Sequence, residues 1–134
     1  MEIWIPRDAD AAYRWEPRLG GFRKPHRNSP NVALQHPSFR GYADYMETAP
    51  FRQALNELLA GAVEARTAIL CSETLWWRCH RRLIADVAAL LYDFRVEHLM
   101  HDGMLREHVP TAGSRVTPER ALRYDVLFVQ DANQ

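Results

Sequence analysis

The residues best suited to chemistry fall within twelve positions, from Cys71 to Arg82, in the run Cys-Ser-Glu-Thr-Leu-Trp-Trp-Arg-Cys-His-Arg-Arg. Two thiols, a carboxylate and an imidazole in this run offer a nucleophile and acid/base catalysts, and three guanidinium groups offer ligands for an anion. The candidates for catalysis are Cys71, Glu73, Cys79 and His80. The candidates in this run for holding an anionic substrate are Arg78 and Arg81.

Four interpretations of the run stay open on spacing alone. A thiolate phosphatase or sulfurtransferase loop places an arginine six positions after the cysteine, but Trp77 stands there and Arg78 comes one position later. A metal site would use Cys71, Cys79 and His80, although zinc ligands usually come in paired C-x-x-C or H-x-x-x-H elements, so no metal ligand is assigned. The third interpretation is an anion or nucleotide site. The fourth is structural, because free cysteines are often simply small buried residues.

Two expected strands and a helix would position this run. The apolar run TAILC at 67–71 is typical of a buried parallel strand, and residues 95–99 form another short strand candidate. Between them, residues 78–92 carry apolar side chains at helical spacing: Leu83, Ile84, Val87, Leu90 and Leu91. Residues 67–99 therefore predict a strand–helix–strand unit with a right-handed crossover. Ligands bind at the carboxyl ends of such strands, where helix N-terminal amides point outward.

A long basic loop is expected before this unit, at residues 17–37. It contains four prolines and the pair Gly20-Gly21, and from residue 17 to residue 40 there are five basic residues and no acidic one. We include four of its residues among the anion-binding candidates: Gly20, Gly21, Arg23 and Lys24. Short strands are expected at 2–5 and 13–16, helices after Ser38 and Thr48, and a closing strand around 122–129.

Composition limits the class of protein. A chain of 134 residues and 15.6 kDa corresponds to one domain, 1–134. Seventeen basic and seventeen acidic residues give no net charge, which disfavours binding to nucleic acid or membrane through bulk positive charge. All the basic residues except Lys24 are arginines, which match the oxygens of phosphate and carboxylate groups. The chain shows no signal-peptide pattern, no membrane-spanning run and no disulfide framework, so we expect a cytoplasmic protein.

Several motifs together resemble the uncharacterised bacterial and archaeal family DUF488. They are LGGFRKPHRNSPN at 19–31, FRGYADYMETAPF at 39–51, Cys-Ser-Glu at 71–73, Arg-Cys-His-Arg-Arg-Leu-Ile-Ala-Asp at 78–86, and His98 with His108. A cysteine, a small residue, a glutamate, a short insert and then Cys-His-Arg is a pattern specific to that family. The resemblance extends from about Arg14 to Val116.

The resemblance implies a small Rossmann-like α/β domain, in which helices cover both faces of a mostly parallel sheet of three to five strands. Carried over to this chain, the family signature falls on Cys71, Glu73, Cys79, His80, Arg81, Gly20, Gly21, Arg23 and Lys24. His108 also matches a family position and is expected to reach the same pocket. The chain departs from the family at its start, which lacks the usual strand, helix and second strand ending in Asp-Val-Arg-Ser. Either the chain is a shortened member that covers the exposed strand edge by dimerising, or its true start lies upstream. Because an uncovered strand edge favours association, we expect a homodimer.

Two functions from different classes are consistent with these observations. The first is a protein that binds or acts on a nucleotide, a nucleic acid or another phosphorylated molecule at the turn 71–82. The alternative is a non-catalytic interaction module with a structural, metal-stabilised cysteine–histidine cluster, linked to DNA repair or stress response. The sequence assigns no cofactor to either function, and no membrane is expected as a partner.

Overall fold

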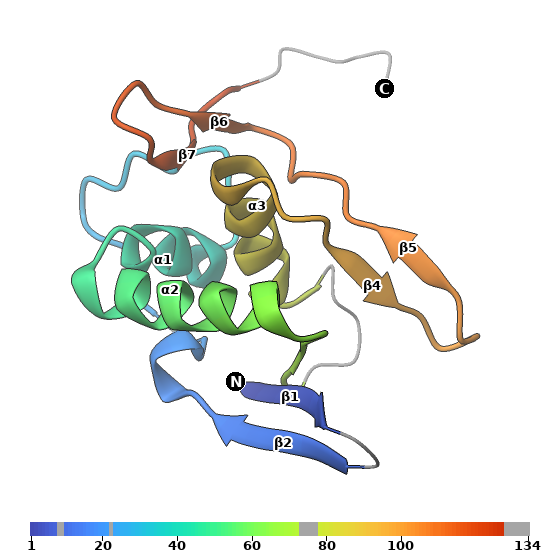
Figure 1. Cartoon of the computed structure of the whole chain (residues 1–134). Coiled ribbons are helices and arrows are strands. Elements are labelled where there is room, and N and C mark those ends of the chain that lie inside the picture. The colour runs from blue at the N-terminus through green and yellow to red at the C-terminus, as the bar shows by residue number, and fades with distance from the viewer. Residues whose placement is uncertain (8–9, 22, 73–77, 128–134) are drawn as a thin grey trace.

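Helices occupy the middle of the molecule in the computed structural model, and small sheets lie around them (Figure 1). The structure describes residues 1–7, 10–21, 23–72 and 78–127. The helices of this part of the chain are α1 (Pro37–Tyr45), α2 (Ala49–Glu64) and α3 (Arg81–Tyr92), preceded by the 3-10 turn η1 (Pro17–Leu19).

The described strands form three separate sheets. The first contains β1 (Glu2–Arg7), β2 (Asp10–Trp15) and β3 (Ala68–Leu70), in the order β2-β1-β3. The second pairs β4 (Glu97–Leu99) with β5 (Leu105–Glu107), and the third pairs β6 (Ser114–Val116) with β7 (Leu122–Tyr124). Every pairing is antiparallel, with Ile3 of β1 lying opposite Arg14 on one side and Ile69 on the other.

The expected Rossmann-like fold with a mostly parallel sheet and helices on both faces is therefore wrong. The elements of the 67–99 unit form, but β3 pairs with β1 and β4 pairs with β5, so α3 does not connect parallel neighbours. The apolar run TAILC misled the prediction because a parallel core strand is buried on both faces. In β3 only Ile69 is half-buried, whereas Ala68 and Leu70 are exposed.

The helices follow the predicted apolar spacing, with differences at their ends. Thr48 is the N-cap residue of α2 as predicted, although its hydroxyl donates to the Tyr45 carbonyl. Ser38 does not cap α1, because the cap is His36, whose Nδ1 accepts the Ser38 backbone N–H, and Pro37 occupies the first turn. In α3 the apolar periodicity is confirmed by the buried side chains Leu83, Ile84 and Val87.

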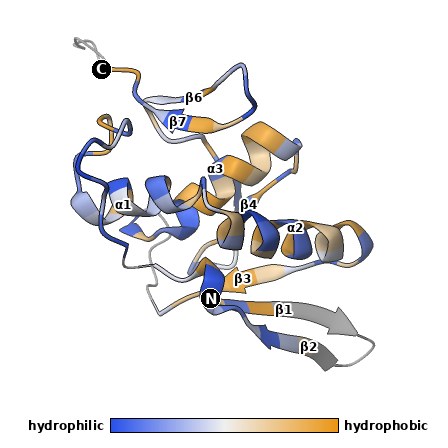
Figure 2. Ribbon diagram, turned by 90° about the vertical axis from the view of Figure 1, so that its left-hand side faces the viewer, coloured by the Kyte–Doolittle hydropathy of each residue, from blue (hydrophilic) through white to orange (hydrophobic). Residues whose placement is uncertain are grey.

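The core lies where the three helices meet. Tyr42 of α1 and Phe51 of α2 are fully buried and pack edge-to-face with ring centroids 5.8 Å apart, and Leu83 of α3 and Tyr124 of β7 complete the same cluster. Figure 2 shows the predominantly hydrophobic colour of α3. Among the described residues, no helix combines the length and apolar character that a membrane crossing requires.

Candidate functional site

The two cysteines meet at the place where β3 ends and α3 is about to begin. Cys71 directly follows β3, and Cys79 precedes the first residue of α3 by two positions. Their Sγ atoms lie 2.8 Å apart, and no disulfide joins them. Cys71 is half-buried and Cys79 is buried. The fold thus brings the two predicted nucleophiles into direct contact.

Cys79 is surrounded by hydrogen-bond donors. Its Sγ accepts the backbone N–H and the side-chain Nε–H of Arg81, both at 3.4 Å, and lies 3.5 Å from Nδ1 of His80. Burial raises the pKa of the Cys79 thiol, but the hydrogen bonds with His80, Arg81 and Cys71 outweigh burial and lower the pKa to about 6. The sulfur also stands at the N-terminus of α3, where the helix dipole favours a negative charge.

His80 is confined by Tyr42 and Gly21. Its ring packs against Tyr42 of α1, with ring centroids 4.9 Å apart and planes inclined by 53°. Gly21 also lies against the ring, because a Cβ at this position would come within 2.9 Å of His80 Nδ1. The Nε2 atom of His80 is buried and has no hydrogen-bond partner in the part of the chain that the structure describes. Only a residue without a side chain at position 21 leaves the imidazole in its place beside Cys79.

Part of the predicted basic loop, around Gly21 and Arg23, lies close to this cluster. The Arg23 guanidinium lies over the Tyr45 ring, 3.9 Å from its centroid, and a Cβ on Gly41 of α1 would overlap the Arg23 carbonyl oxygen. Burial raises the pKa of Tyr42, and the nearby charges of Arg23 and Cys79 act on it in opposite directions. The loop, α1 and the start of α3 therefore enclose one region.

The remaining predicted site residues are Gly20, Lys24, Arg78, Glu73 and His108. Gly20 closes η1 by donating its N–H to the Pro17 carbonyl, while Lys24 and Arg78 are exposed. Glu73 lies outside the described residues. His108 is buried, with Nε2 2.6 Å from Oδ1 of Asp86.

The cluster offers a ligand set for a soft metal ion. One Sγ from each cysteine and one ring nitrogen of His80 all lie within 4.8 Å of one another. Thiolate and imidazole are the donors that zinc prefers, with bonds of about 2.3 Å to sulfur and about 2.0 Å to nitrogen. Small movements would bring the three atoms to these distances, so the residues present fit a zinc ion with one position left open.

Comparison with known proteins identifies the family. The family model described as Domain of unknown function DUF488 matches residues 5–88, which is more than half of the chain. The chain belongs to the DUF488 family. No curated protein and no solved structure matches it. The family resemblance expected from the sequence is thus confirmed, and the matched DUF488 segment contains the Gly20–Lys24 loop, both cysteines and His80.

The structure adds a buried polar network that sequence analysis did not recognise in this DUF488 chain. Asp86 of α3 is fully buried and accepts hydrogen bonds from the Tyr124 hydroxyl at 2.8 Å and the Thr111 backbone N–H at 3.0 Å, besides its contact with His108. His108 Nδ1 lies 2.8 Å from Nε2 of His98. Asp86 lies two positions before the end of the matched segment and both histidines lie beyond it. Their spacing in sequence gave no signal, because the contacts join residues up to 38 positions apart.

Proposed function

We propose that this DUF488 protein is a thiol-dependent protein that binds and acts on a phosphorylated substrate at the turn 71–82, with Cys79 as its nucleophile. The observation that carries the proposal is the Cys79 thiol, whose pKa is lowered to about 6 by donors from His80, Arg81 and Cys71. At pH 7 a thiol with that pKa is about nine-tenths ionised, whereas an ordinary cysteine is ionised to only a few per cent.

A nucleophile must also meet a substrate, and the charges around Cys79 favour an anionic one. Arg81 touches the thiol, and Arg23 approaches the same region over Tyr45. Arg78 and Lys24, which are neighbours in sequence of Cys79 and Arg23, are exposed and carry further positive charge. The loop residue Arg18 is excluded from this role because it binds the carboxylates of Glu16 and Glu57, each at 2.8 Å. Nucleotides, nucleic acid ends and small phosphorylated molecules carry the charge that such groups recognise.

His80 is the acid/base residue of the proposal. A thiolate at Cys79 accepts from Nδ1–H of His80, which leaves Nε2 as the atom that carries the lone pair in the neutral ring and the second proton in the imidazolium. In an attack on a phosphoryl group, a lone pair of Cys79 forms the S–P bond while the P–O bond to the leaving group breaks. The leaving oxygen keeps the electron pair and takes a proton from a protonated His80 or from Glu73, the second acid/base candidate.

A second candidate function rests on the ligand set. Three soft donors within 4.8 Å favour a zinc-stabilised cluster in a non-catalytic interaction module, serving a partner in DNA repair or stress response. Zinc would lower the pKa of both thiols and hold β3 against α3. In that case the sulfurs would be metal ligands rather than free nucleophiles.

The two functions make opposite predictions for alkylation. Under reducing conditions and with metal content measured by elemental analysis, the rate of Cys79 alkylation by iodoacetamide is followed against pH and located by mass spectrometry. The thiol proposal predicts a midpoint near the pKa of about 6, metal-free protein, and slower alkylation when inorganic phosphate is added. Stoichiometric zinc, with alkylation only after chelation, would establish the structural cluster instead. Cys71→Ser serves as the matched variant, since it keeps Cys79 and removes one donor.

A further inference from the structure

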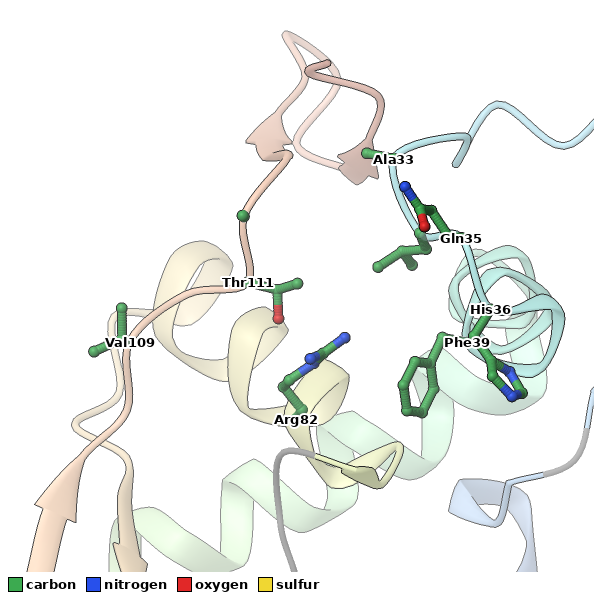
Figure 3. A pocket seen from close by; sticks show the side chains of 9 residues that line it. Ala33, Gln35, His36, Phe39, Arg82, Val109 and Thr111 are labelled. Carbon is green, nitrogen blue, oxygen red and sulfur yellow. The ribbon is translucent and has the colours of Figure 1, made fainter. Parts of the chain in front are cut away.

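A separate hollow lies on another side of the α3 N-terminus, between that helix, the start of α1 and two chain segments (Figure 3). Its volume is about 490 Å³, and its walls come from residues 33–36, Phe39, Arg82 and the segment 109–112. Of the run 71–82, Arg82 lines it, whereas the other candidate residues that the structure describes do not. A concave site of this size is within the range of small-molecule pockets.

The polar side chains of Arg82, Thr111 and Gln35 all line the hollow. The Arg82 guanidinium carbon lies 4.9 Å from the centroid of the Phe39 ring, so stacking fixes the direction of the charged group. Figure 3 shows the Thr111 hydroxyl on the same side of the hollow as Arg82, with the amide of Gln35 across from them. Thr111 Oγ1 is buried and has no hydrogen-bond partner within the described residues. Such a hydroxyl is costly to bury unless a ligand or water satisfies it.

The hollow has a cationic side chain among its described lining residues. Among the described residues that line it there is an arginine, and there is no aspartate or glutamate. His36 also lies at the rim, but its Nδ1 is engaged with Ser38 at the start of α1. A guanidinium group and a hydroxyl together match the oxygens of a carboxylate or phosphate, while Phe39 and Val109 provide apolar wall.

The walls are held in place before any ligand binds. Arg40 donates to the Leu34 carbonyl at 2.8 Å, and the Ala33 N–H donates to the Tyr124 carbonyl at 2.8 Å. On the opposite side, the Thr111 N–H is tied to the buried carboxylate of Asp86. Ligand binding therefore costs little conformational entropy at these segments.

We propose that this hollow binds a small oxyanion that carries a flat apolar group, an aromatic carboxylate or an aryl phosphate. The oxyanion lies against Arg82 and the Thr111 hydroxyl, and the flat group packs on Phe39 and Val109. The proposal goes beyond the thiol chemistry and does not depend on it. His80 contacts Tyr42 whereas Arg82 contacts Phe39, so the two sites lie about one turn apart along α1.

Calorimetric titration of the whole chain with phenyl phosphate, benzoate and inorganic phosphate tests the proposal. At least one of the two aromatic anions is expected to bind about tenfold or more tightly than inorganic phosphate, and which of them binds best identifies the oxyanion. Arg82→Gln is expected to weaken that binding by about tenfold or more, and Thr111→Val by a few fold. Arg115→Gln is the matched control, because this arginine pairs with Asp125 outside the hollow.

Several results would contradict the proposed anion site. Absence of binding by both aromatic anions, or equal weakening by Arg82→Gln and Arg115→Gln, would overturn the proposal. Thr111→Val keeps the test decisive if Arg82→Gln does not fold, because it removes only the hydroxyl. Cys79→Ser is expected to retain full binding. Loss of aromatic-anion binding in this variant would show that the anion occupies the thiol site and would also overturn the proposal, whereas failure of the thiol chemistry alone would leave the binding intact.

Discussion

The acidity of Cys79 results from contacts made by side chains and backbone of two segments. His80 and Arg81 follow it in sequence, whereas Cys71 comes from the end of β3. His80 in turn keeps its place because Gly21 and Tyr42 confine its ring. A change at position 21 should therefore alter the pKa of the Cys79 thiol without contacting the sulfur.

Gly21→Ala tests this chain of contacts. The new Cβ would lie 2.9 Å from His80 Nδ1, so the imidazole must shift, which disturbs its 3.5 Å contact with Cys79 Sγ. We expect the thiol pKa to rise by on the order of one unit, because one stabilising hydrogen bond to the thiolate is lost. The pH dependence of alkylation measures this shift.

Gly61→Ala is the control for the same substitution elsewhere. Nothing lies within 4 Å of a Cβ at Gly61, which belongs to α2. The change should leave the Cys79 pKa unaltered and stabilise the protein by about 0.5–1 kcal/mol, since alanine favours a helix. Equal effects of the two substitutions on the thiol would show that His80 does not control it.

Sequence analysis found the thiols and the imidazole because cysteine and histidine are reactive residue types and stand close together in the sequence. It also placed Gly21 among the candidates, as part of the basic loop and of the family pattern, but not its contact with His80. It could not find the role of Tyr42 beside His80 or the hollow around Arg82. The Tyr42 contact and the hollow both depend on which side of α1 faces α3. The orientation of α1 results from packing between segments that are distant in sequence.

At the scale of elements, helix α3 carries both the thiol site and the buried Asp86 network. Its N-terminus holds the thiol site, and its middle holds Asp86, whose carboxylate binds donors from segments near β5 and β7. The C-terminal third of the chain is thereby attached to the helix that carries the candidate site. The Asp86 network is thus expected to be a main contributor to stability.

Asp86→Ala should destabilise the protein by about 3–5 kcal/mol, because it leaves the buried donors of His108, Tyr124 and Thr111 without an acceptor. Tyr124→Phe removes one donor and should cost about 1 kcal/mol. Urea unfolding measures both changes. Asp125→Ala, which breaks a surface pair with Arg115, is the control and should cost much less. A loss for Asp86→Ala no larger than this control would contradict the role of the network.

The elements themselves were predictable to different degrees. Apolar spacing located α2 and α3, because a helix buries one face and its residues report that face locally. Strand partners are not encoded locally, so TAILC could not reveal that it pairs with β1 in an antiparallel sheet. The expectation of a parallel sheet failed for that reason.

At the scale of the whole molecule, stability should depend on pH through His98. Burial, His108 and the Arg81 charge lower the pKa of His98 to about 4 in the folded protein, while Asp86 acts in the opposite direction. An unfolded histidine has a pKa of about 6.5, so between these values the unfolded state binds more protons. Stability should therefore fall as the pH decreases from 7 towards 4.

Urea midpoints at pH 7 and pH 5 measure this dependence. The wild-type midpoint should decrease at pH 5, and His98→Gln should reduce the decrease, whatever its effect on stability at pH 7. An unchanged pH dependence in His98→Gln would contradict the assignment. The expected homodimer stays a prediction, which sedimentation equilibrium tests separately.

The most direct test of the thiol site is an ultraviolet titration of thiolate absorbance in the native, metal-free protein, compared with Cys79→Ser. The wild-type protein should show one thiol ionising with a midpoint near the pKa of about 6, and this transition should be absent from the variant. A first thiol midpoint above about 8 in the wild-type protein, as for an ordinary cysteine, would contradict the assignment of Cys79 as a nucleophile.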